Sequence, residues 1–186
     1  MTIEDWNRAI GREGSTYELL DGRLCVHPFP EAPHEALQHW LQHAIINYED
    51  VNSAIIQRLT VRAKEYVSNR LGPTIFTPDL AVYLDPGTDR SARHRSWADI
   101  SPTIVGEVLE PPNINSKLDL KVEIYLQVPS IREYWIVDRR LDWDRPKLTV
   151  YRKRGKRWQI PIEVPFGGTY ETKLLPGFKL IVDPRS

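Results

Sequence analysis

Two acidic residues stand in segments of the sequence that are otherwise suited to burial. Asp79 follows Pro78 and opens the apolar run Leu80–Leu84, and Glu107 lies about 28 residues later in the run 104–109. A carboxylate is costly to bury unless it is paired or holds a metal ion. Because sequential strands are often neighbours in a sheet, we expect the two carboxylates to converge on one cation.

The chemistry that such a pair would support is metal-assisted attack of water on a phosphodiester. Carboxylate oxygens are the ligands that Mg²⁺ or Mn²⁺ prefers, and a bound cation polarises the ester and activates the attacking water. A nearby ammonium group would offset the negative charge that develops during the reaction. Lys121 and Lys117 lie one turn apart on the helix predicted after the Glu107 strand, so either lysine could supply this charge.

Each of these residues also has a purely structural interpretation. A Pro-Asp pair is a common turn signal at a strand entry, a buried glutamate can pair with an arginine, and a helix lysine is usually solvated. His39 and His43 lie four residues apart, which is a zinc-compatible spacing, but no third ligand accompanies them and we interpret them as ordinary polar-face residues. The case therefore depends on the acids and a lysine meeting in one place.

The elements that must position these residues predict a mixed α+β fold, with a central mixed β-sheet flanked by helices. Turn signals and apolar periodicity predict helices at Thr2–Ile10, His34–Tyr48 and Ser116–Gln127, a hairpin of Tyr17–Leu20 and Arg23–Val26 around Asp21-Gly22, and strands at Ala54–Val67, Ile75–Leu84, Thr103–Leu109, Glu133–Val137 and Lys147–Tyr151. A chain of 186 residues is long enough for a single domain over residues 1–186 and short for two.

Composition restricts the class of protein. The sequence has 25 basic and 25 acidic residues and therefore no net charge, so affinity for nucleic acid must come from local patches. Its single cysteine, Cys25, can form no intrachain disulfide, and its alternating surroundings predict a packed thiol. No segment is apolar enough to cross a membrane, and we expect a cytoplasmic protein without a membrane partner.

Two basic segments could contact phosphate groups. The run 85–98 combines turn-forming residues with Arg90, Arg93 and Arg95, which favours a surface loop that could reach a substrate. The run 151–158 is also basic and ends in Trp158. We interpret this second run as a solvated hairpin around Gly155, because cations at an exposed turn are inexpensive in water.

Four segments together resemble a known family. TYELLDGRL, TPDLAVYL, TIVGEVLEPPN and KVEIYLQVPSIREYWIVD are similar, in this order, to segments of the Uma-two family of proposed restriction endonucleases in the PD-(D/E)xK superfamily. The resemblance covers roughly residues 15 to 155. It implies a restriction-endonuclease-like core preceded by an N-terminal β-hairpin.

The resemblance also implies roles for individual residues. Asp79 and Glu107 match the family's metal-binding acids, with Glu18 as a candidate third ligand, and His34 matches a position that could contact substrate or water. The lysine that the superfamily usually carries two residues after the acid is absent, since that position is Leu109. The family instead has a helix lysine four residues before a tyrosine, which Lys121 matches.

These observations predict an endodeoxyribonuclease that depends on Mg²⁺ or Mn²⁺. Asp79, Glu107 and Lys121 would be catalytic, while His34, Lys117, Arg93 and Arg95 would contact the substrate. DNA is the expected partner, RNA stays an alternative, and a homodimer would suit cleavage of two strands. The second hypothesis is an inactive nuclease-like scaffold that binds nucleic acid or protein, because Glu110 stands where the family often has Ser-Pro-Ser.

Overall fold

Three β-sheets, of seven, four and two strands, and two long helices make up most of the described part of the chain. The computed structural model describes residues 2–8, 14–52, 55–62, 65–67, 72–84, 101–111 and 115–186. The elements, in chain order, are α1 (Ile3–Arg8), β1 (Ser15–Leu20), β2 (Arg23–Pro28), α2 (Ala32–Val51), β3 (Ile56–Thr60), β4 (Glu65–Val67), β5 (Thr74–Phe76), β6 (Leu80–Leu84), β7 (Ile104–Leu109), α3 (Asn115–Gln127), β8 (Glu133–Asp138), β9 (Lys147–Arg154), β10 (Arg157–Trp158), β11 (Ile162–Val164), β12 (Thr169–Glu171) and β13 (Lys179–Ile181).

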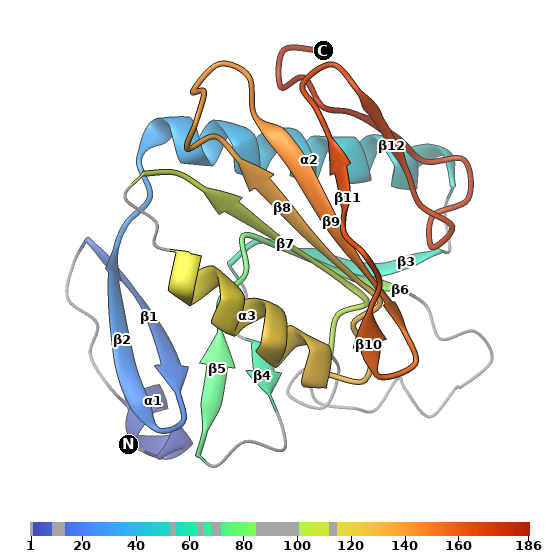
Figure 1. Ribbon diagram of the computed structural model, residues 1–186. Helices are drawn as coiled ribbons and strands as arrows, with labels where there is room; N and C mark the ends of the chain where they lie inside the picture. The colour runs from blue at the N-terminus through green and yellow to red at the C-terminus, as the bar shows by residue number, and fades with distance from the viewer. Residues whose placement is uncertain are drawn as a thin grey trace.

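The larger sheet is mixed and lies between the two long helices (Figure 1). Its strands follow the order β10-β9-β8-β7-β6-β3, with β11 paired to the side of β9. Strands β7 and β8 are parallel and are joined through α3, whereas the other neighbours are antiparallel. The expected mixed sheet flanked by helices is therefore confirmed.

Each face of this sheet has its own apolar core. Helix α2 buries Leu37, Leu41 and Ile45 on the face that also receives the segment containing β12 and β13. Helix α3 buries Ile124 and Tyr125 on the opposite face. Because both faces are covered, β7 is buried along its whole length, as is usual for a parallel strand pair.

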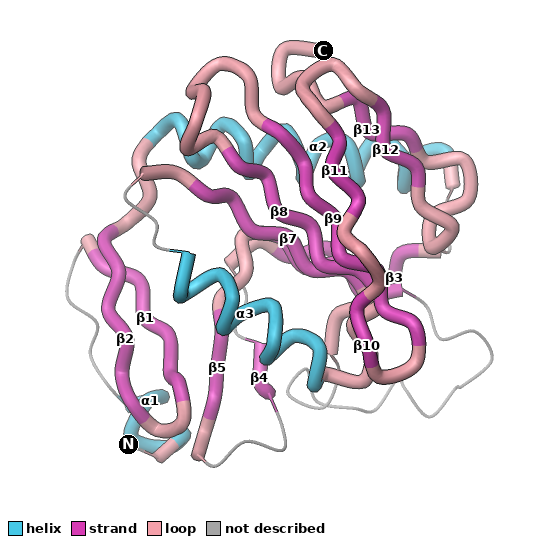
Figure 2. The backbone as a smooth tube through the Cα atoms, in the orientation of Figure 1, coloured by secondary structure: helices cyan, strands magenta, loops and turns pink. Residues whose placement is uncertain are grey.

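The N-terminal elements form as their sequence predicts. Thr2 and Asp5 cap α1 reciprocally, since each side chain accepts a hydrogen bond of 3.0 Å from the backbone N–H of the other residue. Asp21 and Gly22 have φ values of 46° and 78°, the positive angles that a two-residue hairpin turn requires. The hairpin then extends a smaller antiparallel sheet in the order β2-β1-β5-β4 (Figure 2).

Two predicted strands are each divided between the sheets, which corrects the sequence prediction. The run Ile75–Leu84 ends its first strand at Phe76 and enters the larger sheet at Leu80. Pro78 has no N–H to donate to a ladder, so the chain leaves one sheet before it joins the other. The run Ala54–Val67 divides in the same way into β3 and β4. The two segments that pass between the sheets are hydrogen-bonded to each other, because the backbone N–H of Arg62 donates to Pro78 O at 3.0 Å.

Further predictions concern Cys25, the two histidines and the basic hairpin. Cys25 is half-buried rather than packed in a core. His39 and His43 are exposed on α2, as expected for polar-face residues, and the hairpin at Gly155 forms with exposed cations at its tip. Among the described residues, no helix has the length and apolar character needed to span a bilayer. The expected loop 85–98 lies outside the described residues.

Candidate active site

Asp79 lies at the point where the chain enters the larger sheet, and it is held by contacts with the neighbouring strand β7 and with helix α2. Its Oδ2 accepts a 2.8 Å hydrogen bond from the backbone N–H of Val108 on β7. On the α2 side, Oδ1 lies 2.9 Å from His34 Nε2, and Gln38 donates to the backbone carbonyl of Asp79 at 2.8 Å. The carboxylate is therefore fixed in orientation before any ligand binds.

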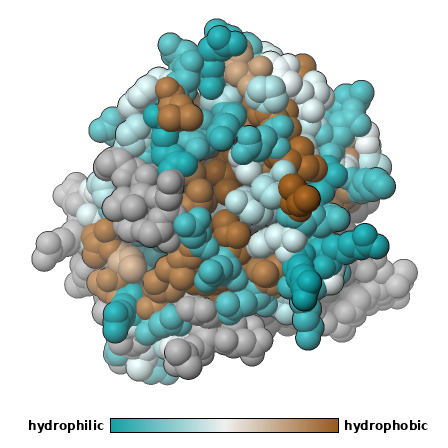
Figure 3. All heavy atoms as spheres, viewed as in Figure 1, coloured by the Kyte–Doolittle hydropathy of each residue, from teal (hydrophilic) through white to brown (hydrophobic). Residues whose placement is uncertain are grey.

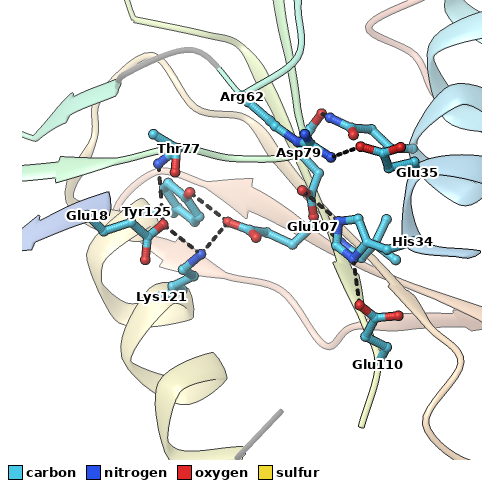
Figure 4. Close-up of polar contacts among 12 residues, drawn as sticks. Glu18, His34, Glu35, Arg62, Thr77, Asp79, Glu107, Glu110, Lys121 and Tyr125 are labelled. Carbon is cyan, nitrogen blue, oxygen red and sulfur yellow. Dashed lines mark hydrogen bonds and ion pairs between the residues drawn. The ribbon is translucent and has the colours of Figure 1, made fainter. Parts of the chain in front are cut away.

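Glu107 stands beside Asp79 on the next strand. The antiparallel register pairs Leu80 with Gly106, which places Asp79 level with Glu107. Side chains alternate along a strand, so Glu107 faces α3, where its Oε1 accepts hydrogen bonds from Lys121 Nζ at 2.8 Å and Tyr125 OH at 3.0 Å. Figure 4 shows this convergence of α3 and β7.

The surroundings of Glu107 disfavour its ionised form. Burial raises the pKa of this carboxyl, and the negative charges of Asp79 and Glu18 raise it further, while Lys121 opposes them. The net result is a pKa of about 7. This acid therefore changes its charge near neutral pH, which is unusual for a glutamate and is frequent in functional sites.

Lys121 bridges Glu107 to a second buried acid. Its Nζ lies 3.1 Å from Glu18 Oε1, and the other oxygen of Glu18 lies 3.2 Å from His27 Nε2. Burial opposes both charges, but the pairing outweighs it: the pKa of Lys121 is raised above its ordinary value, and the pKa of Glu18 is lowered to about 2. Lys121 is therefore a permanent ammonium group between two carboxyl groups.

His34 connects the metal-binding candidate Asp79 to Glu110. Its Nδ1 lies 3.4 Å from Glu110 Oε1, while its Nε2 contacts Asp79. Burial lowers the pKa of the imidazole, but the hydrogen bond to Asp79 and the charges of both acids outweigh burial and raise it. Glu110, the departure from the Ser-Pro-Ser pattern, thus takes part in the same network (Figure 4).

The structure brings five of the predicted residues together and leaves three undescribed. Asp79, Glu107, Lys121, Glu18 and His34 all line one cavity. Lys117 belongs to α3, but its side chain lies outside the described residues, as do Arg93 and Arg95 altogether. Of the two candidate lysines, Lys121 is the one that the structure places against Glu107.

Three residues of the network were not predicted as site residues. Tyr125 is the tyrosine four residues after Lys121, and its hydroxyl group donates a hydrogen bond to Glu107. The spacing of four residues that places both side chains on one helix face was the available signal. Gln38 carried no comparable signal, because Asp79 lies 41 residues away. His27 lies in the same hairpin as its partner Glu18, but nothing in its sequence surroundings marked it as a site residue.

The cavity that these residues line has a volume of about 530 Å³. Its wall carries five acidic residues and three permanently cationic ones, namely Glu18, Glu31, Asp79, Glu107, Glu110, Arg62, Lys121 and Arg140. An excess of carboxylates repels a phosphodiester and attracts a cation. Glu107 is only partly ionised near neutral pH and the pKa of His34 is raised, so the excess of negative charge is small until Glu107 releases its proton.

The donor set fits a cation that keeps most of its water or substrate ligands. Among the described residues, no group of three or more His, Cys, Asp or Glu side chains has the geometry to hold a metal ion. Asp79 and Glu107 alone supply two carboxylates, and Mg²⁺ is commonly held by one or two carboxylates together with water and substrate phosphates. Hydrogen-bonded carboxylate oxygens retain further lone pairs for coordination.

The fold is shared with a protein of known structure. The chain superimposes on the crystal structure of "a putative nuclease belonging to DUF820" from Anabaena variabilis ATCC 29413 with a TM-score of 0.70 and 15% sequence identity, over 100% of this chain and 96% of the other. The Uma2 family, described as "Putative restriction endonuclease", matches residues 3–183. The chain therefore belongs to the Uma2 family. A search of curated proteins gave no significant match.

Proposed function

We propose that this protein is an endonuclease that hydrolyses phosphodiester bonds in DNA with the help of Mg²⁺ or Mn²⁺. One observation carries the proposal: Asp79, Glu107 and Lys121 come from three separate elements and meet in one acidic cavity. Membership of a family described as restriction endonucleases supports the same reaction class. DNA is the proposed substrate, and RNA is the alternative to be assayed beside it.

Asp79 and Glu107 would hold the cation in this proposal, with Glu18 as a further acid nearby. A divalent ion bound there would polarise the phosphodiester and lower the pKa of the attacking water. The hydrogen bonds from Val108 and His34 keep the Asp79 carboxylate oriented, so little ordering is needed when the ion binds. Ionisation of Glu107 near neutral pH makes this carboxylate available at physiological pH.

Lys121 would stabilise the negative charge that develops on the phosphoryl oxygens. Its ammonium group lies 2.8 Å from Glu107 and is held charged by its two acidic neighbours. In the overall reaction the water oxygen forms a bond to phosphorus, one phosphorus–ester oxygen bond breaks, and the released oxygen takes a proton that water supplies. An ammonium beside the phosphorus lowers the barrier to this step.

A second candidate function is an inactive scaffold that binds nucleic acid or protein. The observation that favours it is the extent to which protein groups already satisfy the acids, with His34 and Val108 on Asp79 and with Lys121 and Tyr125 on Glu107. A titration with Mn²⁺ separates the two candidates. Failure to bind at millimolar metal would favour the scaffold.

Plasmid cleavage by the purified protein tests the leading proposal. We expect nicking or linearisation with Mg²⁺ or Mn²⁺, no cleavage in EDTA, and loss of cleavage in Asp79→Ala and Glu107→Ala. Activity that is unchanged in both variants would reject the proposal. A cytoplasmic location and a homodimer stay predictions, and size-exclusion chromatography with light scattering would test the second.

A further inference from the structure

Two large aromatic side chains stand exposed on the wall of the acidic cavity. Phe29 is 54% exposed and Trp143 is 51% exposed, and both line the cavity that holds Asp79 and Glu107. Residues of this size are usually buried, and exposed ones gathered at a site often mark a binding surface. On the face drawn in Figure 3, apolar side chains also gather over α3, β5 and the β1–β2 hairpin.

The backbone holds both aromatic residues in place. Phe29 lies between Pro28 and Pro30, whose rings restrict the chain, and its N–H donates to Gly14 O at 3.0 Å. Trp143 lies in the turn between β8 and β9, where the Arg139 guanidinium lies 4.3 Å from the centre of its ring. Both exposed rings are therefore held in defined positions by contacts with the rest of the protein.

The turn around Trp143 is ordered by its own side chains. Asp142 Oδ1 accepts hydrogen bonds from the backbone N–H groups of Asp144 at 3.0 Å and Arg145 at 3.1 Å. At the start of the turn, the Arg140 guanidinium donates two hydrogen bonds to Asp138, at 2.9 and 2.8 Å, and the Arg140 backbone N–H donates a third at 3.0 Å. An aromatic ring held in this way loses little conformational entropy when a ligand stacks on it.

The cavity has more apolar room than a phosphate group can use. At about 530 Å³ it falls within the range of sites that take small organic ligands. The wall includes apolar residues as well as the carboxyl groups and Lys121, namely Leu20, Leu109, Pro111, Leu118 and Leu120. A flat group of low polarity that is attached next to a phosphate suits such a mixed wall, and a nucleobase has these properties.

We propose that the substrate is a single-stranded or locally unpaired nucleic acid, with a base next to the cleaved phosphate stacked on Trp143 and Phe29. This inference rests on the proposed function. In a paired duplex each base is already stacked between its neighbours and must leave the helix to reach a pocket, which costs free energy. Stacking on aromatic side chains tolerates any base, so the site selects strandedness rather than sequence.

Steady-state cleavage of one oligonucleotide, single-stranded and annealed to its complement, tests this inference. We expect a higher kcat/KM on the single strand. Trp143→Ala should raise KM on the single strand by about 5- to 100-fold with little change in kcat, and Trp143→Phe should restore much of the affinity because it keeps a ring. Leu141→Ala is the matched control, since Leu141 is 90% exposed in the same turn and does not line the cavity.

Binding measured in Ca²⁺ by fluorescence anisotropy separates this inference from the proposed function. Tighter binding of the single strand that is lost in Trp143→Ala supports the base contact even in a protein that does not cleave. Equal binding by the wild type and Trp143→Ala would overturn the inference, as would a duplex that is bound and cleaved as well as the single strand. Absence of metal-dependent cleavage in the wild type would count against the proposed function alone.

Discussion

The neighbouring strands β7 and β8 each carry one buried glutamate, and the two glutamates have different surroundings. Glu107 is 7% exposed and Glu133 is 4% exposed, so burial does not distinguish them. They lie on opposite faces of the sheet, with Glu107 toward α3 and Glu133 on the face where Trp135 packs. The two glutamates therefore differ in their hydrogen-bond partners and not in how deeply they are buried.

Glu133 has donors on both of its oxygens and does not line the acidic cavity. Trp135 Nε1 and Tyr170 OH donate to Oε2 at 2.8 and 2.9 Å, and Thr172 Oγ1 donates to Oε1 at 2.7 Å. Arg152 Nε lies 3.5 Å from the same Oε1. Because Tyr170 and Thr172 belong to the C-terminal part of the chain, Glu133 ties this part to the sheet.

Glu107 differs from Glu133 in lining a cavity together with other acids. Its hydrogen bonds from the described residues all reach Oε1, and its side chain lines the acidic cavity. Its pKa is raised to about 7, with burial as the main cause. The comparison teaches that a buried acid serves structure where fixed donors satisfy it, and is available for chemistry where it faces a cavity and other acids.

The largest expected difference between the two glutamates is in catalysis. Glu107→Gln removes a proposed metal ligand and should lower the cleavage rate by more than about 100-fold, beyond what is typical for residues that only support a ligand. Glu133→Gln should keep activity within about 3-fold below its melting temperature, because it is remote from the reacting atoms. Rates of plasmid nicking in Mg²⁺ measure both. Equal losses of cleavage rate in the two variants would contradict the different roles of the two glutamates.

Stability should show the reverse order. Glu133→Gln replaces one carboxylate oxygen, which accepts hydrogen bonds, with an NH2 group that can only donate them. This change should lower the free energy of unfolding by about 1–3 kcal/mol. Glu107→Gln should cost less, because it removes a carboxyl group that burial already disfavours in its ionised form. Guanidinium denaturation of the metal-free proteins checks this order. A larger loss of stability in Glu107→Gln than in Glu133→Gln would show that Glu107, and not Glu133, has the structural role.

The pH dependence of metal binding should sharpen the comparison further. The pKa of Glu107 is raised to about 7, so the metal-free carboxyl is protonated below that pH and must release its proton to bind a cation. The apparent affinity for Mn²⁺ should therefore fall by roughly tenfold per pH unit below about 7 and level off above it. Glu133→Gln should show the same profile. Affinity that does not vary between pH 5.5 and 8 would contradict this role of Glu107.

Much of this arrangement could be predicted from local sequence signals. Asp21-Gly22 predicted a hairpin because a two-residue turn depends on the backbone angles that these two residues can adopt. The apolar spacing along His34–Tyr48 predicted the long helix. An acid inside an apolar strand marked Glu107. The division of Ile75–Leu84 was missed because apolar alternation does not tell which sheet a strand joins, although Pro78 lies where the chain crosses.

Contacts between distant segments account for what the sequence could not show. Glu133 looked like an ordinary strand residue, since two of its partners, Tyr170 and Thr172, lie 37 and 39 residues away. Trp143 carried no periodicity that would place it on the cavity wall. The meeting of Asp79, Glu107 and Lys121 agrees with the predicted convergence, whereas their roles in metal binding and cleavage stay a proposal.

Calorimetric titration of the metal-free protein with Mn²⁺ at pH 8 tests the central claim most directly. We expect saturable binding in the wild type and in Glu133→Gln, and a loss of more than about tenfold in affinity in Asp79→Asn and in Glu107→Gln. Unchanged Mn²⁺ affinity in both Asp79→Asn and Glu107→Gln would contradict this claim.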